Sequence, residues 1–387
     1  MWPVWIGALV AAIWAYLMIA RGGFWLCSER DERVPEGPRQ PLSARPSVTA
    51  VIPARNEAEG IADTVTSLIR QDDPGPWTII LVDDDSSDGT ADAARRAAAA
   101  LGAADRLRVM SGRTLPRGWT GKLWAVKQGV EAAQADAHPP DYILLSDADI
   151  VYAPDVLSDL VARAQARRLV LTSLMVKLRC ESFAERSLIP AFIFFFQMLY
   201  PFSWVNRPAS ATAAAAGGCM LVRSDALKAA GGIDAIRNAL IDDCSLAKLM
   251  KARGPIWLGL TERVHSTRPY PRLEDIRRMV ARSAYAQLRY SPLLLAGTVL
   301  GMALTYLAPP LLAAFASGPA QWLGLSAWAM MAVMFQPTLR LYGRSPLWGL
   351  PLPAIALCYM LFTLDSALQH ARGKGGLWKG RVQTTEP

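Results

Sequence analysis

The sequence predicts an α/β fold flanked at both ends by transmembrane helices, and three observations support this. Strand-like and helix-like segments alternate from Ser47 onward, acidic clusters follow several of the strand-like segments, and long uncharged runs lie near both termini. Alternation of this kind is typical of βαβ units and therefore of a largely parallel sheet. Ligands of such sheets bind beyond the carboxyl ends of the strands.

Four uncharged runs predict membrane spans: residues 2–20, 292–318, 319–339 and 346–364. About 18 consecutive apolar residues suffice to cross a bilayer as a helix. The whole 387-residue chain is 52% hydrophobic, but residues 40–290 have an ordinary globular composition. We therefore expect four parts, in chain order an N-terminal anchor at 1–22, a soluble domain at 45–290, a C-terminal transmembrane region at 291–367 and a basic tail at 368–387.

The N-terminal run lacks the marks of a cleaved signal peptide, because no basic residue precedes it and no small-residue cleavage site follows. Basic residues come directly after it, namely Arg21, Arg30, Arg33, Arg39 and Arg45. The positive-inside rule then places the soluble domain in the cytoplasm. The net charge of +8 suits a surface close to anionic lipid.

Two other classes of partner find no support in the sequence. It has no helix-turn-helix, zinc or aromatic RNA-binding pattern, so we expect no nucleic acid to bind. The five cysteines are scattered without a C-x-x-C pair, which predicts neither a zinc site nor a disulfide framework.

The first half of the soluble domain alternates strand and helix. SVTAVIPA is rich in β-formers, and Gly60 to Gln71 carries a helical apolar stripe. WTIILVDD is a continuous apolar strand, as expected when both faces of a parallel sheet are covered. An Ala-rich helix follows, for which Asp88 and Thr90 are cap candidates, and it ends near Gly102.

The alternation continues to the fourth strand. LRVMSG is the third predicted strand, a helix is expected around Leu123 to Ala133, and YILLSDAD contains the next strand. Polar clusters follow the first, second and fourth strands as ARNE, DDDSSDGT and SDAD. The ends of these strands are therefore the candidate site.

Asp147 and Asp149 point to the same side of an extended segment and repel each other unless a positive charge lies between them. A Mg²⁺ or Mn²⁺ ion is the simplest such charge, because hard cations bind carboxylates together with phosphate oxygens. Asp83, Asp84 and Asp85 can accept hydrogen bonds from a nucleoside. A loop capped by Asp88 explains only one of the acids in that cluster.

These residues resemble the family 2 glycosyltransferases with a GT-A fold. SVTAVIPARNE, LVDDDSSDGT, SDAD and IDDCSLAKLMKARG occur in that order within about residues 45–270. The flanking spans, GWTGKLWA and WKGR also resemble the hopene-associated glycosyltransferases of hopanoid-making bacteria. The resemblance implies a Rossmann-like domain and an inverting enzyme of the bacterial inner (cytoplasmic) membrane. Its donor would be a nucleotide sugar, with UDP-sugar expected, and its acceptor a lipid hydroxyl, expected to be that of a hopanoid.

The resemblance also implies the roles of individual residues on the donor side. Pro53, Arg55 and Glu57 line the nucleoside pocket, and Asp84 contacts the base or ribose. Lys122 faces the diphosphate, which its compact charge suits. Asp147 lies near the ribose, and Asp149 holds the divalent metal.

On the acceptor side, Asp242 and Asp243 occupy the acidic pair of the family, whose second member is the catalytic base. This sequence has Asp where the family usually has Glu at the first position, so either acid is a candidate. GGCMLVRSDAL (217–227) matches the small-residue segment beside the acceptor. His265 is a candidate metal or phosphate ligand, although a lone histidine is also compatible with a structural role.

The last predictions concern the membrane-facing segments. A single crossing by 188–205 would separate the two acidic pairs, so we expect this segment to lie on the bilayer surface. Arg282 and Arg289 are candidates to contact the leaving diphosphate or to be merely solvated. The number of C-terminal spans stays open. A processive polysaccharide synthase and a non-catalytic lipid-binding protein are the alternatives; the former usually carries Q-x-x-R-W, which is missing here.

Overall fold

The computed structural model describes residues 1–32, 45–72, 75–373, 377–378 and 381–382. The chain divides into two compact units. The sheet unit comprises residues 29–178, 204–268 and 377–387, and the helical unit comprises 1–28, 179–203 and 269–376. Arg33, Arg39 and half of the expected basic tail lie outside the described residues.

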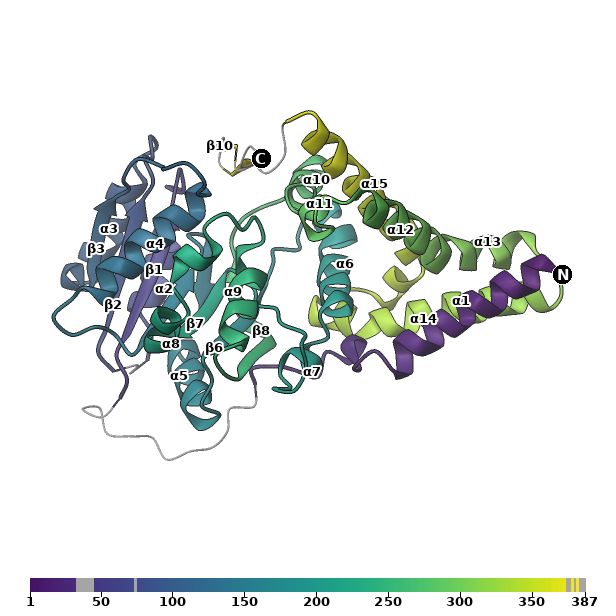
Figure 1. Ribbon diagram of the computed structural model, residues 1–387, viewed down its shortest axis with the longest axis horizontal. Helices are drawn as coiled ribbons and strands as arrows, with labels where there is room; N and C mark the ends of the chain where they lie inside the picture. Colours follow the sequence, from purple (N-terminus) through teal and green to yellow (C-terminus); the bar gives the residue numbers. More distant parts are fainter. Residues whose placement is uncertain (33–44, 73–74, 374–376, 379–380, 383–387) are drawn as a thin grey trace. The chain divides into compact units, whose positions relative to one another are not determined.

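The described part of the sheet unit contains an eight-stranded mixed sheet of order β3-β2-β1-β4-β7-β6-β8-β5 (Figure 1). Strands β1 to β4 are parallel, β7 is antiparallel to both β4 and β6, and β5 is antiparallel to β8. The α/β fold predicted from the sequence is confirmed. The strands are β1 Val48–Ala54, β2 Trp77–Asp83, β3 Leu107–Ser111, β4 Tyr142–Ser146, β5 Ile150–Tyr152, β6 Leu171–Lys177, β7 Cys219–Arg223 and β8 Ile256–Ser266.

Helices cover both faces of this sheet, which explains the continuous apolar strand. Ile79 and Leu81 of β2 belong to the core shared with α2, α3 and α5, whereas Ile80 and Val82 pack with Ala125 of α4. Successive side chains of a strand point to opposite faces, so the buried positions 79–82 of β2 all need an apolar residue. The helices are α2 Ile61–Ile69, α3 Thr90–Ala100, α4 Gly121–Gln134, α5 Val156–Ala166, α8 Ser224–Ala229 and α9 Asp242–Lys251, with a 3₁₀ turn η4 at Ile233–Ile236.

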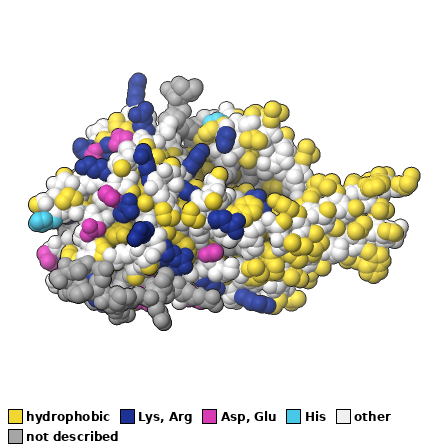
Figure 2. Space-filling model, turned by 60° about the horizontal axis from the view of Figure 1, so that its bottom comes forward, with side chains coloured by type: hydrophobic (Ala, Val, Ile, Leu, Met, Phe, Trp, Pro, Cys, Tyr) yellow, Lys and Arg dark blue, Asp and Glu magenta, His cyan; other side chains and the backbone are white. Residues whose placement is uncertain are grey.

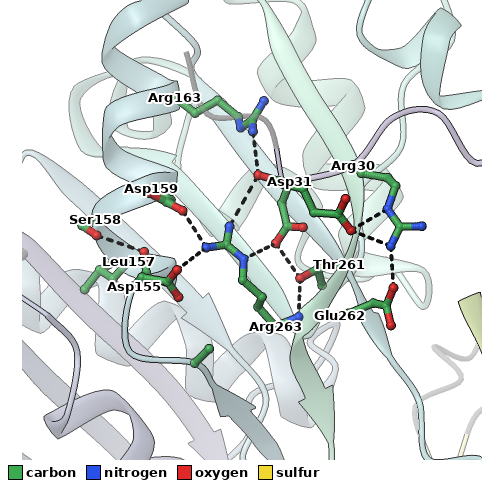
Figure 3. Close-up of polar contacts among 12 residues, drawn as sticks. Arg30, Asp31, Asp155, Leu157, Ser158, Asp159, Arg163, Thr261, Glu262 and Arg263 are labelled. Atoms are coloured by element: carbon green, nitrogen blue, oxygen red, sulfur yellow. Dashed lines mark hydrogen bonds and ion pairs between the residues drawn. The ribbon is translucent and has the colours of Figure 1, made fainter. Parts of the chain in front are cut away.

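A charged cluster fastens the start of the sheet unit to β8 (Figure 3). Asp31 is 3% exposed, and its Oδ2 accepts hydrogen bonds from the Thr261 hydroxyl at 2.6 Å and from Arg263 Nε at 3.2 Å. Arg263 also donates to Asp155 and Asp159 at the start of α5. Removing one partner of such a buried ion pair is costly, so this cluster fixes β8 and the residues that follow it.

Among its described residues, the helical unit contains three helices long and apolar enough to span a membrane: Trp2–Ile19 (α1), Pro292–Phe315 and Leu352–Ala371 (α15). Pro292–Phe315 comprises α12 (Pro292–Met302), a π-helical stretch (Ala303–Leu307) and α13 (Ala308–Phe315). The expected span at 319–339 is helical as α14 (Pro319–Leu341) but is not among the three. Its buried face packs on α1. The unit also contains η1 Phe24–Leu26, α10 Leu273–Ala281, α11 Ala284–Gln287 and η6 Pro346–Gly349.

The expected interfacial segment 188–205 begins within α6 (Phe183–Leu199), and Phe202–Val205 forms the short helix α7. α6 starts at a capping box in which Ser182 and Glu185 bond each other's backbone. Its middle is buried and packs on α10, α14 and α15. Most of α6 is therefore covered by neighbouring helices within its own unit, because its large apolar side chains find partners there. Arg282 and Arg289 also belong to this unit.

Candidate active site

Lys122 lies between two acidic residues that are 95 positions apart in the sequence. α4 begins at Gly121, where the Thr120 side chain caps the helix by accepting a hydrogen bond from Leu123 N. Lys122 Nζ lies 2.9 Å from Asp147 Oδ1 and 3.1 Å from Asp242 Oδ2. Burial alone lowers the pKa of Lys122, but the two carboxylates outweigh it and the pKa is raised. The ammonium is therefore charged at neutral pH, and it joins the end of β4 to the start of α9.

Asp243 is held beside this ion pair by backbone amides. Its Oδ2 accepts a hydrogen bond from Gly217 N at 3.1 Å, and its Oδ1 accepts one from Cys244 N at 2.7 Å. Burial and the neighbouring Asp242 raise the pKa of Asp243 to about 6, against the opposing effects of Lys122 and the amides. A carboxylate with this pKa is ionised at neutral pH and accepts a proton more readily than an ordinary aspartate.

A small pocket opens at this point. Its polar lining includes Lys122, Ser146, Asp147 and Asp242, and Pro53, Leu123, Val126, Leu145, Gly217, Met220, Ile233, Ile236 and Leu246 complete it. A Cβ on Gly217 would lie 3.4 Å from Lys122 Nζ and 3.7 Å from Asp243 Oδ2. These are ordinary van der Waals distances, so the backbone at Gly217 lies beside both charged groups without requiring a glycine.

Arg268 neutralises the second acid of the D-x-D pair. Asp149 is 8% exposed, and its Oδ2 accepts hydrogen bonds from the Ser266 hydroxyl at 2.8 Å and from Arg268 Nε at 2.9 Å. Arg268 Nη2 also donates to Glu57 Oε1 at 2.6 Å. Sequence analysis missed Arg268. The spacing of two residues between Ser266 and Arg268 could have indicated it, because residues two positions apart at the end of a strand lie on the same face.

His265 has no place beside Asp149. It pairs with Val151 in the antiparallel ladder of β8 and β5 and is exposed, on the face opposite to that of Ser266. Among the described residues, no three His, Cys, Asp or Glu side chains gather in a metal-binding group. The carboxylate oxygens of Asp147 and Asp149 nevertheless fit a hard divalent cation that takes its other ligands from phosphate and water.

Arg55 holds the loop that follows β2. Its Nη1 donates to the backbone oxygens of Asp84 and Asp85, and it lies 3.8 Å from Asp84 Oδ2. Asp84 is 3% exposed, at the end of β2. Asp88 accepts hydrogen bonds from Thr90 N and Ala58 N, so it ties the loop after β1 to the loop after β2. Neither expected cap residue is the N-cap of α3, because that position is Gly89 and Thr90 is already the first helical residue.

Comparisons with known proteins identify the fold and the family of the domain. Residues 49–231 match the model of glycosyl transferase family 2. These residues form a family 2 glycosyltransferase domain. The prediction of a family 2 glycosyltransferase is thereby confirmed. A search of curated protein sequences finds no match.

The GT-A fold is confirmed by a solved structure. The chain is similar to the mannosyltransferase PcManGT from Pyrobaculum calidifontis in complex with GDP-Man and Mn²⁺, with a TM-score of 0.54 and 19% identity over 93% of this chain and 99% of that one. Mannosyl-3-phosphoglycerate synthase from Rubrobacter xylanophilus is 18% identical, covering 70% and 84% of the two chains, but its TM-score of 0.42 is too low to carry an argument. The PcManGT match supports the fold of the family 2 domain.

The raised pKa of Asp243 predicts the pH dependence of sugar transfer. If Asp243 is the base, it must be ionised, so kcat/KM is expected to fall tenfold per pH unit below about 6 and to be level above it. Asp242→Asn removes one charge that raises this pKa, so the midpoint of any residual activity is expected to shift to lower pH. Initial rates between pH 4.5 and 8.5 measure both. A midpoint near 4 in the unaltered enzyme contradicts the assignment.

Proposed function

We propose that this protein is a membrane-bound inverting glycosyltransferase that moves a sugar from a nucleotide sugar, a UDP-sugar in the first instance, to the hydroxyl of a hopanoid lipid. The observation that carries the proposal is the gathering of Asp147, Lys122 and Asp242 beside Asp243, where a pocket opens at the edge of the sheet. This arrangement supplies charges for a diphosphate and a base for an acceptor hydroxyl within one site.

On the donor side, Asp147 and Asp149 are the residues that would hold a divalent metal. The metal, when bound, supplies positive charge that stabilises the leaving diphosphate. Lys122 pairs with Asp147, so its ammonium lies where it can contact a phosphate oxygen of the donor instead of that carboxylate. A flexible ammonium is suited to such a change of partner. Pro53 lines the same pocket, and Glu57 accepts a hydrogen bond from Arg268. Asp84 is the proposed contact of the nucleoside.

On the acceptor side, Asp243 is the proposed base. Its two amide hydrogen bonds orient the carboxylate, and Asp242 and Lys122 set its electrostatic surroundings. Deprotonation of the acceptor hydroxyl by Asp243, with attack opposite the leaving diphosphate, inverts the anomeric centre. Asp242 is proposed to keep Lys122 in place, so it acts through Lys122 rather than on the acceptor.

The helical unit supports a lipid acceptor. Exposed large apolar side chains cover its helices, among them Trp2, Trp5, Leu293, Leu300 and Phe315. In Figure 2, hydrophobic side chains dominate the visible surface of the terminal helices, and charged side chains gather elsewhere. We propose that 1–22 and 291–367 anchor the protein in the bacterial inner membrane, with the domain at 45–290 in the cytoplasm.

A non-catalytic lipid-binding protein is the second candidate, on the same apolar surface. A lipid-binding function gives no reason for a half-buried network of Lys122, Asp147 and Asp242 at the edge of the sheet. Asp243→Asn separates the two functions, because asparagine keeps the size of the side chain but cannot accept the proton. Turnover is expected to fall about 10² to 10⁴-fold. Donor affinity and melting temperature are expected to change little.

The matched control is Asp242→Asn on the same helix turn. If Asp243→Asn retains near-normal turnover while Asp242→Asn is inactive, the base is Asp242. If both variants turn over normally, neither acid is the base.

Membrane attachment is tested by extraction. Integral spans are buried in hydrocarbon, so alkaline carbonate and high salt are expected to leave the intact chain in the membrane pellet. A peripheral protein held by its basic surface is released by salt, which screens surface charge. Recovery of the intact chain in the soluble fraction contradicts the proposed anchors.

The acceptor is tested by lipid analysis of a strain lacking the gene. We expect one glycosylated hopanoid to disappear, its unglycosylated form to accumulate, and the intact gene to restore it. A strain expressing Asp243→Asn is the control, since its membranes contain the protein without the proposed base. An unchanged hopanoid profile together with the loss of another glycolipid assigns the enzyme a different acceptor.

A further inference from the structure

Arg268 bridges two carboxylates that come from different parts of the sheet edge. Asp149 follows β4 and Glu57 follows β1, and the guanidinium reaches them through Nε at 2.9 Å and Nη2 at 2.6 Å. Both carboxylates are mostly buried, with side-chain exposures of 11% for Asp149 and 14% for Glu57. Two buried carboxylates need compensating positive charge, and Arg268 supplies it at the proposed metal position.

Hydrogen bonds connect the chain immediately before Arg268 to Asp149. Thr267 N donates to the Asp149 backbone oxygen at 2.9 Å, Ser266 donates to the carboxylate, and Arg268 N donates to Ser266 Oγ at 3.2 Å. The backbone of 266–268 is thus tied to Asp149 independently of the guanidinium. The side chain of Arg268 can therefore leave the carboxylates while its backbone stays in position.

We propose that Arg268 is a positioning residue that occupies the place of the divalent cation in the free enzyme and transfers to the diphosphate when nucleotide and metal bind together. The inference rests on the proposed use of a nucleotide sugar and deepens it. The fork that binds two carboxylates also matches two phosphate oxygens. Arg268 thus exchanges one pair of anionic partners for another.

This exchange makes metal and nucleotide binding cooperative. Without nucleotide, a metal ion must compete with the arginine for Asp149, so binding is weak. With nucleotide, the phosphate oxygens give the guanidinium new partners and the carboxylate becomes available. The coupling is reciprocal, so metal strengthens nucleotide binding by the same factor, and couplings of this kind are typically about 5- to 150-fold.

Manganese binding to Arg268→Gln tests the proposal. Titration of the full-length protein in detergent, followed by the electron paramagnetic resonance signal of free Mn²⁺, gives the affinity with and without UDP, and with GDP in parallel. We expect Arg268→Gln to bind Mn²⁺ alone at least about tenfold more tightly than the unaltered protein, because a competing charge is gone. The enhancement by nucleotide is expected to shrink by a similar factor. Equal or weaker binding of Mn²⁺ alone by the variant overturns the proposal.

Arg95→Gln is the matched control, since Arg95 lies on the exposed side of α3 and pairs only with Asp92 among the contacts that the structure describes. It removes the same charge and is expected to leave the Mn²⁺ affinity unchanged within twofold. A gain equal to that of Arg268→Gln shows that net charge alone is responsible and overturns the proposal.

Arg268→Lys covers the case in which Arg268→Gln fails to fold. It keeps the positive charge but not the fork, so its affinity for Mn²⁺ alone is expected to lie between those of the unaltered protein and Arg268→Gln. Its enhancement of Mn²⁺ binding by nucleotide is expected to be reduced. Full retention of that enhancement in Arg268→Lys counts against the exchange of bidentate partners. If the unaltered protein binds neither UDP nor GDP in the presence of Mn²⁺, the proposed use of a nucleotide sugar is wrong. The affinities of Arg268→Gln and of the unaltered protein for Mn²⁺ alone then still decide whether Arg268 competes for the site.

Discussion

Compensation of negative charge at one edge of the sheet is the constraint on which the site depends. Asp147, Asp149 and Asp242 lie with Asp243 in a largely buried region, where carboxylates repel strongly. Two side chains of the protein itself resolve the repulsion. Lys122 takes Asp147 and Asp242, and Arg268 takes Asp149 together with Glu57. Each acid of the D-x-D pair therefore has its own positive partner from the chain, and neither partner bridges the two.

The mixed topology of the sheet brings these charges together. The parallel half supplies the loops after β1 and β2 and the D-x-D pair after β4. Insertion of β7 antiparallel to β4 puts the start of β7 next to the end of β4, since Ser146 pairs with Cys219. Gly217 thereby reaches Asp243, and α9 presents its first residue, Asp242, to Lys122. A chemical site is thus assembled from segments about 100 residues apart because one strand reverses direction.

The arrangement also separates the two chemical tasks electrostatically. Asp147 and Asp242 share one ammonium, whereas Asp243 accepts hydrogen bonds from two backbone amides in the described part of the chain and has a raised pKa. The proposed cation-binding acids and the proposed base need different environments, and these neighbouring acids have them. The charged cluster around Asp31 and Arg263 fixes β8, whose end delivers Ser266 and Arg268 to Asp149.

The sequence by itself determined the α/β class, the positions of β1 to β4 and the acidic clusters at their ends, because these follow from local periodicity and from residue types that need no distant partner. The tertiary structure decided what no local pattern contains. His265 and Ser266 are adjacent, yet strand alternation and the pairing with β5 send only Ser266 to Asp149. Lys122 was expected at a diphosphate but lies between two acids, and Arg268 was not expected at all. Which charge meets which depends on contacts between residues far apart in the chain, and those contacts exist only once the strands have paired.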